Sequence, residues 1–405
     1  MKSTQDPPDG LRRDRPPAVV LGDLNLIRPL AMGGIPVVLV APRPNDAAIR
    51  SRHLTAHYVI PGLNEPHLEQ PAARLLELGA AMRLALGRRV PLFYSSDKHL
   101  ELIYRHRPQI EERFLVLLNE EETALSLHDK ERFYLLTERL GIPAPRTLRS
   151  GADLERRLGA LQEPLLVKPK RKTAWRRIQQ DLLAGSGKAM VFATRAELLA
   201  DPAFARHEDD VIIQEYIPGG VDRLVSFHGF CDRGSRLLAS YCGRKIRTYP
   251  SFAGDSCFIE LVKDEAVAAA GRAIVEKLGL RGPFKIDFIR DERTGNLCTL
   301  EINARFNLWN HLGAVNGVNL PLIAYDYLVH DRAPARDAGY EPRCKWLNFY
   351  SDYRAFRERH QVGELGLGSW LASIADPSIV HETFAWRDPA PFMQWLGEAI
   401  RAKLT

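Results

Sequence analysis

Three side chains that carry oxygen atoms lie on two neighbouring segments in the second half of the chain. Asp287 belongs to the alternating segment FKIDFI, and Glu301 and Asn303 belong to LCTLEIN, which follows after a short polar turn. Carboxylate and amide oxygens suit a small hard cation that keeps water and phosphate oxygens as its other ligands. These residues therefore predict a magnesium site that also binds a nucleotide.

Arg305 follows on the same face of the second segment as Glu301 and Asn303, because side chains alternate along a strand. A fixed guanidinium charge there could stabilise negative charge on a transferred phosphoryl group or an attacked acyl carbon. The alternative is an ordinary hairpin with solvated acidic residues. The ordered set of two carboxylates, an amide and an arginine argues against that alternative.

The two segments have the pattern of a β-hairpin. Apolar and polar residues alternate over residues 284–289, so Lys285 and Asp287 share one face. Residues 291–296 are rich in Asp, Thr, Gly and Asn, as turns are, and residues 297–302 form the second predicted strand. In such a hairpin Glu301 and Asn303 stand opposite Asp287.

The N-terminal third is predicted to be an α/β domain with a parallel sheet. Helical patterns alternate with short apolar runs at residues 18–21, 37–41, 58–60, 90–94 and 114–117. The turn that begins at Gly22 opens a helix, and Asp97 follows the fourth run, at the kind of place where open sheets bind ligands. Helix capping explains Asp97 equally well.

Two lysines at strand edges are candidate phosphate ligands. Lys168 ends the apolar run 165–168, and Lys188 precedes the run 189–192, with the basic segment KPKRKTAWRR and a GSG sequence between them. A P-loop is excluded, because position 182 is Leu rather than Gly and Ala189 follows Lys188.

Two further segments bear on ligand binding. Residues 211–217, VIIQEYI, form a predicted buried strand that can present backbone groups to the edge of a base. Residues 224–230 and 236–242 form a predicted antiparallel pair, which the motif GRKIR closes. The cations of that motif, Arg244, Lys245 and Arg247, indicate an acidic substrate.

Composition sets broad limits. A chain of 405 residues with 45% hydrophobic and 26% charged residues predicts a soluble protein of two or three domains. A net charge of +6 favours anionic ligands. The five cysteines include no CxxC pair, and no leader or membrane-spanning run is found, so we expect reduced thiols and a cytoplasmic protein without membrane contacts.

The order of these motifs resembles the ATP-grasp superfamily, and in particular the carboxylate–amine ligases related to the large chain of carbamoyl phosphate synthase and to D-aspartate ligase. The resemblance runs from Ala18 to the C-terminus. The motifs that carry it are FKIDFIRD, EINARFN, HLGAVNGVNLPLIAYDYL, Asp129-Lys130 with GIPAPRT, LLVKP, QEYIPGGVD and GRKIRTYP.

The resemblance implies a mixed α/β and α+β architecture. After a flexible tail at residues 1–17, it implies a Rossmann-like pre-ATP-grasp domain at residues 18–125 and a two-lobed ATP-grasp domain at residues 126–330, with a lid at about 150–217. Residues 331–405 would pack on the ATP-grasp core.

It also implies roles for individual residues. Asp287, Glu301 and Asn303 would hold Mg²⁺, with Mn²⁺ as an alternative, and Lys168 and Lys188 would bind ATP phosphates. Gln214, Glu215, Tyr216 and Ile217 would hold adenine, with Glu215 taking its amino group, and Asp222 would meet the ribose. Arg305 and Arg247, together with Lys245, would act on the acyl phosphate. The long basic insertion between the two lysines departs from the tight glycine loop of many family members.

The implied function is an ATP-dependent ligase that activates a carboxylate as an acyl phosphate and joins it to an amine, with an amino acid among the candidate substrates. A homodimer is left open. The alternatives are a kinase on the same scaffold and a nucleotide-binding or nucleic-acid-binding protein without turnover. The last is disfavoured because Trp175 is the one aromatic residue among the cations of the basic segment.

Overall fold

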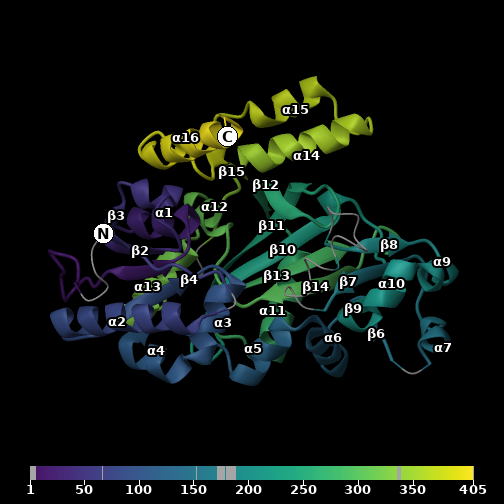
Figure 1. Cartoon of the computed structure of the whole chain (residues 1–405), viewed down its shortest axis with the longest axis horizontal. Helices are drawn as coiled ribbons and strands as arrows, with labels where there is room; N and C mark the ends of the chain where they lie inside the picture. Colours follow the sequence, from purple (N-terminus) through teal and green to yellow (C-terminus); the bar gives the residue numbers. More distant parts are fainter. Residues whose placement is uncertain are drawn as a thin grey trace.

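The computed structural model describes residues 6–65, 67–151, 153–170, 178, 188–334 and 339–404. In this part of the chain the strands form a five-stranded, a four-stranded and a seven-stranded sheet. Figure 1 shows the five-stranded sheet in purple and blue on one side, the four-stranded sheet in teal on the other, and the seven-stranded sheet between them. Helices from the C-terminal part lie across one end of this arrangement.

The N-terminal sheet is parallel, with strand order β3-β2-β1-β4-β5. Its strands and helices are β1 (Ala18–Leu21), α1 (Leu24–Met32), β2 (Val37–Ala41), the short helix η1 (Ala47–Arg50), β3 (Leu54–Val59), α2 (Glu69–Leu86), β4 (Val90–Tyr94), α3 (Asp97–Arg105), α4 (Arg107–Arg113) and β5 (Phe114–Leu115). The predicted Rossmann-like arrangement is therefore confirmed. The strand order reverses between β1 and β4, and the turns after these two strands meet there.

Two edges of that sheet differ from the prediction. Strand β3 begins at Leu54 rather than at residue 58, because its first half alternates between exposed and half-buried residues and so lacks an apolar run. Strand β5 ends at Leu115 rather than at residue 117. Both strands lie at the outer edges of the sheet, where one side has no neighbour.

The four-stranded sheet is antiparallel and has the order β6-β9-β7-β8. Its elements are β6 (Thr147–Arg149), α7 (Leu154–Leu158), β7 (Leu165–Pro169), β8 (Met190–Phe192), α9 (Arg195–Ala200), α10 (Pro202–His207), η2 (Glu208–Asp210) and β9 (Val211–Glu215). Strand β9 ends two residues earlier than predicted. The basic residues 171–177 and the GSG residues 185–187 lie outside the described residues.

The seven-stranded sheet has the order β14-β13-β10-β11-β12-β15-β16. It is built from β10 (Leu224–Cys231), β11 (Leu237–Tyr249), β12 (Asp255–Val262), β13 (Gly282–Arg290), β14 (Leu297–Asn303), β15 (Lys345–Leu347) and β16 (Val380–His381). The helices α5 (Glu121–His128), α6 (Lys130–Arg139) and α11 (Glu265–Leu278) and the turn η3 (Val221–Arg223) belong to the same part of the chain.

The prediction that the GRKIR motif closes the β10–β11 pair is wrong. Strand β11 continues through the motif to Tyr249, and its second half pairs with β12, a strand that the sequence did not predict. Gly243 marks close packing and not a turn, since a Cβ atom there would lie 2.1 Å from the ring of Trp309.

The C-terminal part contains α12 (Asn310–Val315), α13 (Leu320–His330), α14 (Phe349–Gln361), α15 (Leu367–Ile374) and α16 (Ala390–Leu404). Residues 310–315 are helical. Strands β15 and β16 extend the central sheet beyond β12. None of the helices in the described residues combines the length and apolar character needed to cross a bilayer.

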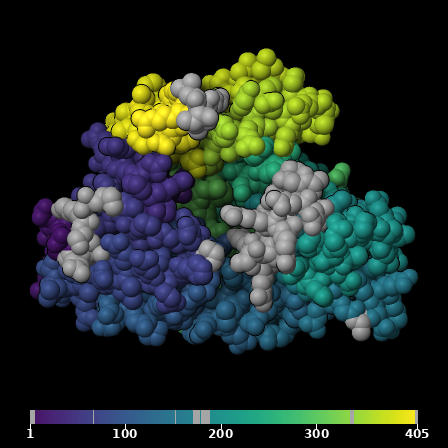
Figure 2. All heavy atoms as spheres, viewed as in Figure 1, coloured from purple at the N-terminus to yellow at the C-terminus, as the bar shows by residue number. Residues whose placement is uncertain are grey.

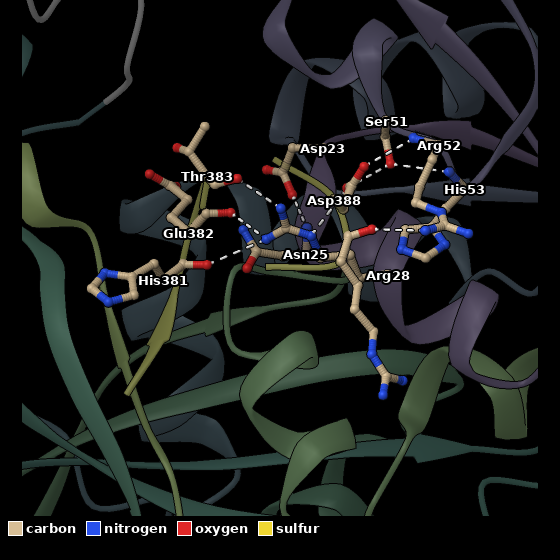
Figure 3. A network of polar contacts seen from close by, with 11 residues as sticks. Asp23, Asn25, Arg28, Ser51, Arg52, His53, His381, Glu382, Thr383 and Asp388 are labelled. Atoms are coloured by element: carbon tan, nitrogen blue, oxygen red, sulfur yellow. Dashed lines mark hydrogen bonds and ion pairs between the residues drawn. The ribbon is translucent and has the colours of Figure 1, made fainter. Parts of the chain in front are cut away.

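A buried polar network joins the two ends of the chain (Figure 3). The guanidinium of Arg28 on α1 donates to the carbonyls of His381, Glu382 and Thr383 at 3.3, 2.9 and 2.7 Å. It also lies 3.6 Å from the carboxylate of Asp388, and both side chains are almost fully buried. Asp388 in turn accepts from the hydroxyl of Ser51 at 2.8 Å. The N-terminal domain and the C-terminal part are thereby held together.

A hydrophobic core also joins the N-terminal sheet to one face of the central sheet. Phe93 on β4 packs against Phe306, with 5.3 Å between the ring centroids. Trp309 and Leu312 belong to the same buried cluster as Leu26 and Ile27 of α1. This packing brings the end of β14 against the turns that follow β1 and β4.

Candidate active site

The predicted hairpin is present as β13 and β14, and its register brings the candidate metal ligands together. Asp287 lies directly opposite Glu301, and Lys285 lies opposite Asn303. The register shifts just beyond Asp287, between that residue and Phe288. All four side chains therefore share one face of the central sheet, as the alternation of residues indicated.

Asp287 is the most buried of these side chains, at 4% exposed. The ammonium of Lys285 lies 2.7 Å from Oδ2 of its carboxylate, and Oδ1 has no hydrogen-bond partner among the described residues. Asn303 donates to Glu301 at 3.1 Å. Because unsatisfied buried oxygens are costly, this carboxylate fits a bound cation.

The donor set suits magnesium better than a metal that needs a full protein cage. Among the described residues, no group of three or more His, Cys, Asp or Glu could hold a metal ion. Magnesium, however, is usually bound through one or two carboxylates together with water and substrate phosphates. Asp287, Glu301 and Asn303 supply oxygens of that kind.

Lysine side chains face these acids. Burial and the neighbouring charge of Lys130 lower the pKa of Lys168 to about 8, while Glu301 opposes the shift. Burial also lowers the pKa of Lys130, whose ammonium donates to the carbonyl of Pro169 at 3.1 Å. Lys130 and Lys168 therefore lie together near Glu301, as a pair of cations suited to a phosphate chain.

In the sequence, Lys130 is named only as part of the motif Asp129-Lys130, and no role is predicted for it. The feature that could have identified Lys130 is its position as the first residue of α6, directly after the capping residue Asp129. The second predicted lysine, Lys188, lies close enough to Lys130 to lower its pKa. Lys188 forms an ion pair with Asp255 at the start of β12.

Arg305 lies where it was predicted, beside Asn303. Its guanidinium donates to the side-chain oxygen of Asn303 at 3.0 Å and to Asp97 at 2.5 Å. It also donates to the carbonyl of Ser95 at 3.1 Å. The arginine thus joins the end of β14 to the turn between β4 and α3.

The three cations of the GRKIR motif do not lie together. Lys245 is the member that lies near Asp287. Burial lowers the pKa of Lys245, and the nearby charge of Asp287 opposes that shift. Arg244 is exposed and pairs with Glu260 at 3.0 Å. The register of β11 against β12 shifts on both sides of Arg247, so simple alternation fails there.

Arg247, to which the resemblance assigns a role on the acyl phosphate, pairs with the C-terminal helices. Its guanidinium is buried and binds both carboxylate oxygens of Asp352 on α14, at 2.6 and 3.0 Å. It also donates to Ser373 at 3.0 Å and lies over the ring of Phe258. These contacts are with the C-terminal helices and a neighbouring strand, so Arg247 has the surroundings of a structural residue.

The predicted adenine segment is split between the two faces of β9 and the loop after it. Gln214 is fully buried and donates to Thr147 at 2.7 Å, while Glu215 accepts from the backbone of Gln162 at 3.0 Å. The ring of Tyr216 lies 6.5 Å from that of Phe252. Ile217 is buried and Asp222 is exposed in η3. The carboxylate of Glu215 therefore already has a partner, whereas the buried side-chain oxygen of Gln214 has none among the described residues.

The cluster joins the central sheet to its two neighbours, since Arg305 contacts Asp97 of the N-terminal domain and Glu301 lies near Lys168 of the four-stranded sheet. Figure 2 shows that the surface is recessed between the purple N-terminal domain, the yellow-green C-terminal helices and the teal lobe. An open cavity of about 620 Å³ lies beside the ends of β6 and β7 and is lined by Glu131, Arg149 and Lys170. It is a different feature, because none of the predicted site residues lines it.

Comparison with known proteins agrees with this geometry. Residues 128–307 match the family model described as an ATP-grasp domain. The chain is 25% identical over 240 residues to a D-aspartate ligase of Enterococcus faecium (strain Aus0004), which covers 56% of each chain. It is 24% identical over 198 residues to a D-alanine–D-alanine ligase of Stutzerimonas stutzeri (strain A1501), covering 45% of this chain and 57% of that one. The chain thus spans little more than half the length of these curated relatives.

Solved structures share the fold at low identity. The N5-carboxyaminoimidazole synthetase of Staphylococcus aureus, complexed with ADP, has a TM-score of 0.57 at 12% identity, over 80% of this chain and 79% of that one. The biotin carboxylase domain of the Hydrogenobacter thermophilus 2-oxoglutarate carboxylase, in complex with MgADP, has a TM-score of 0.57 at 16% identity, over 79% and 70%. The described architecture is that of an N-terminal Rossmann-like domain followed by a two-lobed ATP-grasp fold, and residues 128–307 are the part of the chain that matches the ATP-grasp domain.

Proposed function

We propose that this protein is an ATP-dependent ligase that activates a substrate carboxylate as an acyl phosphate and joins it to an amine, releasing ADP and phosphate. The observation that carries the proposal is the facing of Asp287 and Glu301 across one ladder, with lysines and Arg305 around them. The ligase names of the two curated relatives support the same reaction class.

ATP and Mg²⁺ are the proposed cofactors, with Mn²⁺ as an alternative. Asp287, Glu301 and Asn303 would hold the metal, which supplies positive charge that neutralises the phosphate oxygens during transfer. Lys130, Lys168 and Lys188 would bind the phosphate chain. The segment from Gln214 to Ile217 would hold adenine, and Asp222 would meet the ribose.

The side chains then act by position and charge. A substrate carboxylate oxygen placed in line with the terminal phosphorus of ATP attacks it, and ADP leaves. The amine next attacks the carbonyl carbon of the acyl phosphate, and phosphate leaves with the electron pair of the broken C–O bond. Arg305 and Lys245 would stabilise the negative charge on the oxygens of the acyl phosphate. No side-chain nucleophile is needed.

The identity of the substrates is less constrained than the reaction class. The cations of the GRKIR motif predict an acidic substrate, but two of them already have acidic partners in the protein. Arg244 pairs with Glu260, and Arg247 pairs with Asp352. Lys245 is the member of the motif that remains for a substrate. We therefore propose small-molecule carboxylate and amine substrates, an amino acid being one candidate, and keep a cytoplasmic location and a homodimer as further proposals.

Product analysis tests this proposal directly. The purified protein would be incubated with MgATP and a panel of carboxylates, with and without amine donors, and ADP and free phosphate would be measured together with the mass of the organic product. A ligase gives equal amounts of ADP, phosphate and an amide that contains both substrates. A phosphorylated product without free phosphate would instead establish the kinase alternative, and the absence of ADP formation across the panel would contradict both.

A further inference from the structure

Asp97 and Arg305 form a contact between two domains at the edge of the candidate active site. Nε of Arg305 donates to a carboxylate oxygen of Asp97 at 2.5 Å, and each side chain is 17% exposed. Asp97 is the first residue of α3 in the N-terminal domain, whereas Arg305 follows β14 of the central sheet. The sequence identified both residues as candidates for separate reasons and gave no sign that they touch.

The guanidinium of Arg305 is nearly saturated by the protein. Of the five N–H groups of an arginine, four have acceptors among the described residues. Nε donates to Asp97, the two on Nη1 donate to the carbonyls of Ser95 and Phe306, and one on Nη2 donates to Asn303. The second N–H of Nη2 is thus the one that a bound anion can accept from without displacing a protein partner.

Asp97 is itself held in place before any ligand binds. Ser96 caps α3 by accepting from the backbone of His99 at 3.1 Å, and the backbone of Ser95 donates to the carbonyl of Leu21 at 3.1 Å. A carboxylate in the first turn of a helix is also favoured by the helix dipole. The turn lies where the strand order reverses between β1 and β4, which is the place where open α/β sheets bind ligands.

We propose that Asp97 is a positioning residue that orients the guanidinium of Arg305. The docked N-terminal domain thereby directs the second N–H of Nη2, which has no acceptor among the described residues, toward the reacting group. Asp97 acts through Arg305 and not on the metal ligands. The effect on reaction rate depends on the ligase function proposed above, but the orientation of Arg305 does not.

The test compares Asp97→Ala and Asp97→Asn with Glu101→Ala as a matched control. Glu101 lies one turn later on the same helix and pairs with Lys98 at 3.0 Å and with Arg105 at 2.6 Å. Since a small misplacement near the chemistry can cost about 10²-fold, Asp97→Ala is expected to lower kcat by about tenfold or more. The KM for ATP should stay within about twofold of the wild-type value, because the contacts that bind ATP equally in the ground state and the transition state are unchanged.

Asp97→Asn should recover most of the lost kcat, because its amide oxygen still accepts from Nε of Arg305, and Glu101→Ala should match the wild type. The single variant Arg305→Ala and the double variant that combines it with Asp97→Ala should have the same kcat, since the effects of substitutions in residues that act as a unit are not additive. A wild-type kcat in Asp97→Ala, losses that add in the double variant, or an Asp97→Asn as slow as Asp97→Ala would each overturn the proposal.

A readout without turnover separates this inference from the proposed function. The Nε–H signal of Arg305 in ¹⁵N-labelled protein, assigned by its loss in Arg305→Lys, should exchange slowly with water in the wild type and in Asp97→Asn. It should exchange rapidly in Asp97→Ala. If the Nε–H of Arg305 still exchanges slowly with water in Asp97→Ala, the positioning role is contradicted, whether or not the wild type is an active ligase. If the wild type forms no product but the exchange pattern holds, the ligase assignment fails and the positioning inference stands.

Discussion

Asp287 and Glu301 face each other across the β13–β14 ladder, on the face of the central sheet that also carries Lys245 and Lys285. Two facing carboxylates repel each other unless a cation lies between or beside them. In the proposed reaction that cation arrives with the triphosphate. The pairing therefore makes the hairpin the part of the molecule on which the proposed reaction depends.

Replacing either acid by its amide should abolish the reaction and leave the fold intact. We expect Asp287→Asn and Glu301→Gln to lower the rate of ADP release by about 10²–10³-fold or more, as for the loss of a main electrostatic contact. Both variants should still fold, because each amide has the shape of the acid that it replaces, although Asp287→Asn also weakens the ion pair with Lys285. Glu260→Gln is the control, since Glu260 pairs with Arg244 on the same sheet and should leave the rate unchanged. Near-wild-type ADP release by either site variant would contradict the assignment.

The pKa of Lys168, lowered to about 8 by burial and by Lys130, predicts a pH dependence of nucleotide affinity. The lysine loses its charge as the pH rises above that value, so the affinity for ATP should fall by up to about tenfold per pH unit. Lys168→Arg keeps its charge over this range and should show a flatter profile between pH 7 and 9.5. Titration calorimetry of both proteins measures this. Parallel profiles would show that Lys168 does not contact the phosphates.

The pair of Arg28 and Asp388 predicts how the C-terminal part is held. Replacing Arg28 by Met leaves Asp388 buried without its cation and three carbonyls without their donor (Figure 3). Breaking a buried pair in this way costs about 3–5 kcal/mol. Arg28→Met should therefore lower the urea midpoint and make the β16–α16 connection sensitive to limited proteolysis. Arg52→Ala, which removes an exposed contact at 3.3 Å, is the control and should change neither.

Glu382 predicts a pH dependence of stability. Burial, followed by the nearby charge of Asp23, raises its pKa from the ordinary 4.5 to about 7. A carboxyl whose folded pKa is raised contributes stability that is complete below about pH 4.5 and is lost as the pH rises through about 7. The wild type should thus lose about 1–3 kcal/mol relative to Glu382→Gln between pH 5 and pH 8. Unfolding temperatures of the two proteins that change in parallel across this range would contradict the shift.

The sequence was most informative where an element is buried on both sides or alternates strictly. Strands β1, β2 and β4 have the predicted bounds because a parallel sheet covered by helices produces uninterrupted apolar runs. The hairpin was predicted with its facing residues because the period of two fixes which side chains share a face.

The predictions failed where the face of a residue depends on register shifts or on distant partners. Arg247 was assigned to the acyl phosphate by the resemblance alone, whereas in the structure the register of β11 shifts on both sides of it and it pairs with Asp352 of α14. The contact between Asp97 and Arg305 depends on how two domains pack, which no local pattern encodes. Lys130 lies near Lys168 only because α6 lies beside the end of β7.

The most direct measurement is calorimetric titration of the purified protein with ATP in the presence of Mg²⁺, repeated with EDTA in place of the metal and with Asp287→Asn and Glu301→Gln. The account predicts saturable binding of ATP to the wild type that weakens sharply without Mg²⁺ and in both variants. Binding that is equally tight with and without the metal, or no binding of ATP at all, would contradict the claim that this hairpin holds a magnesium–nucleotide complex.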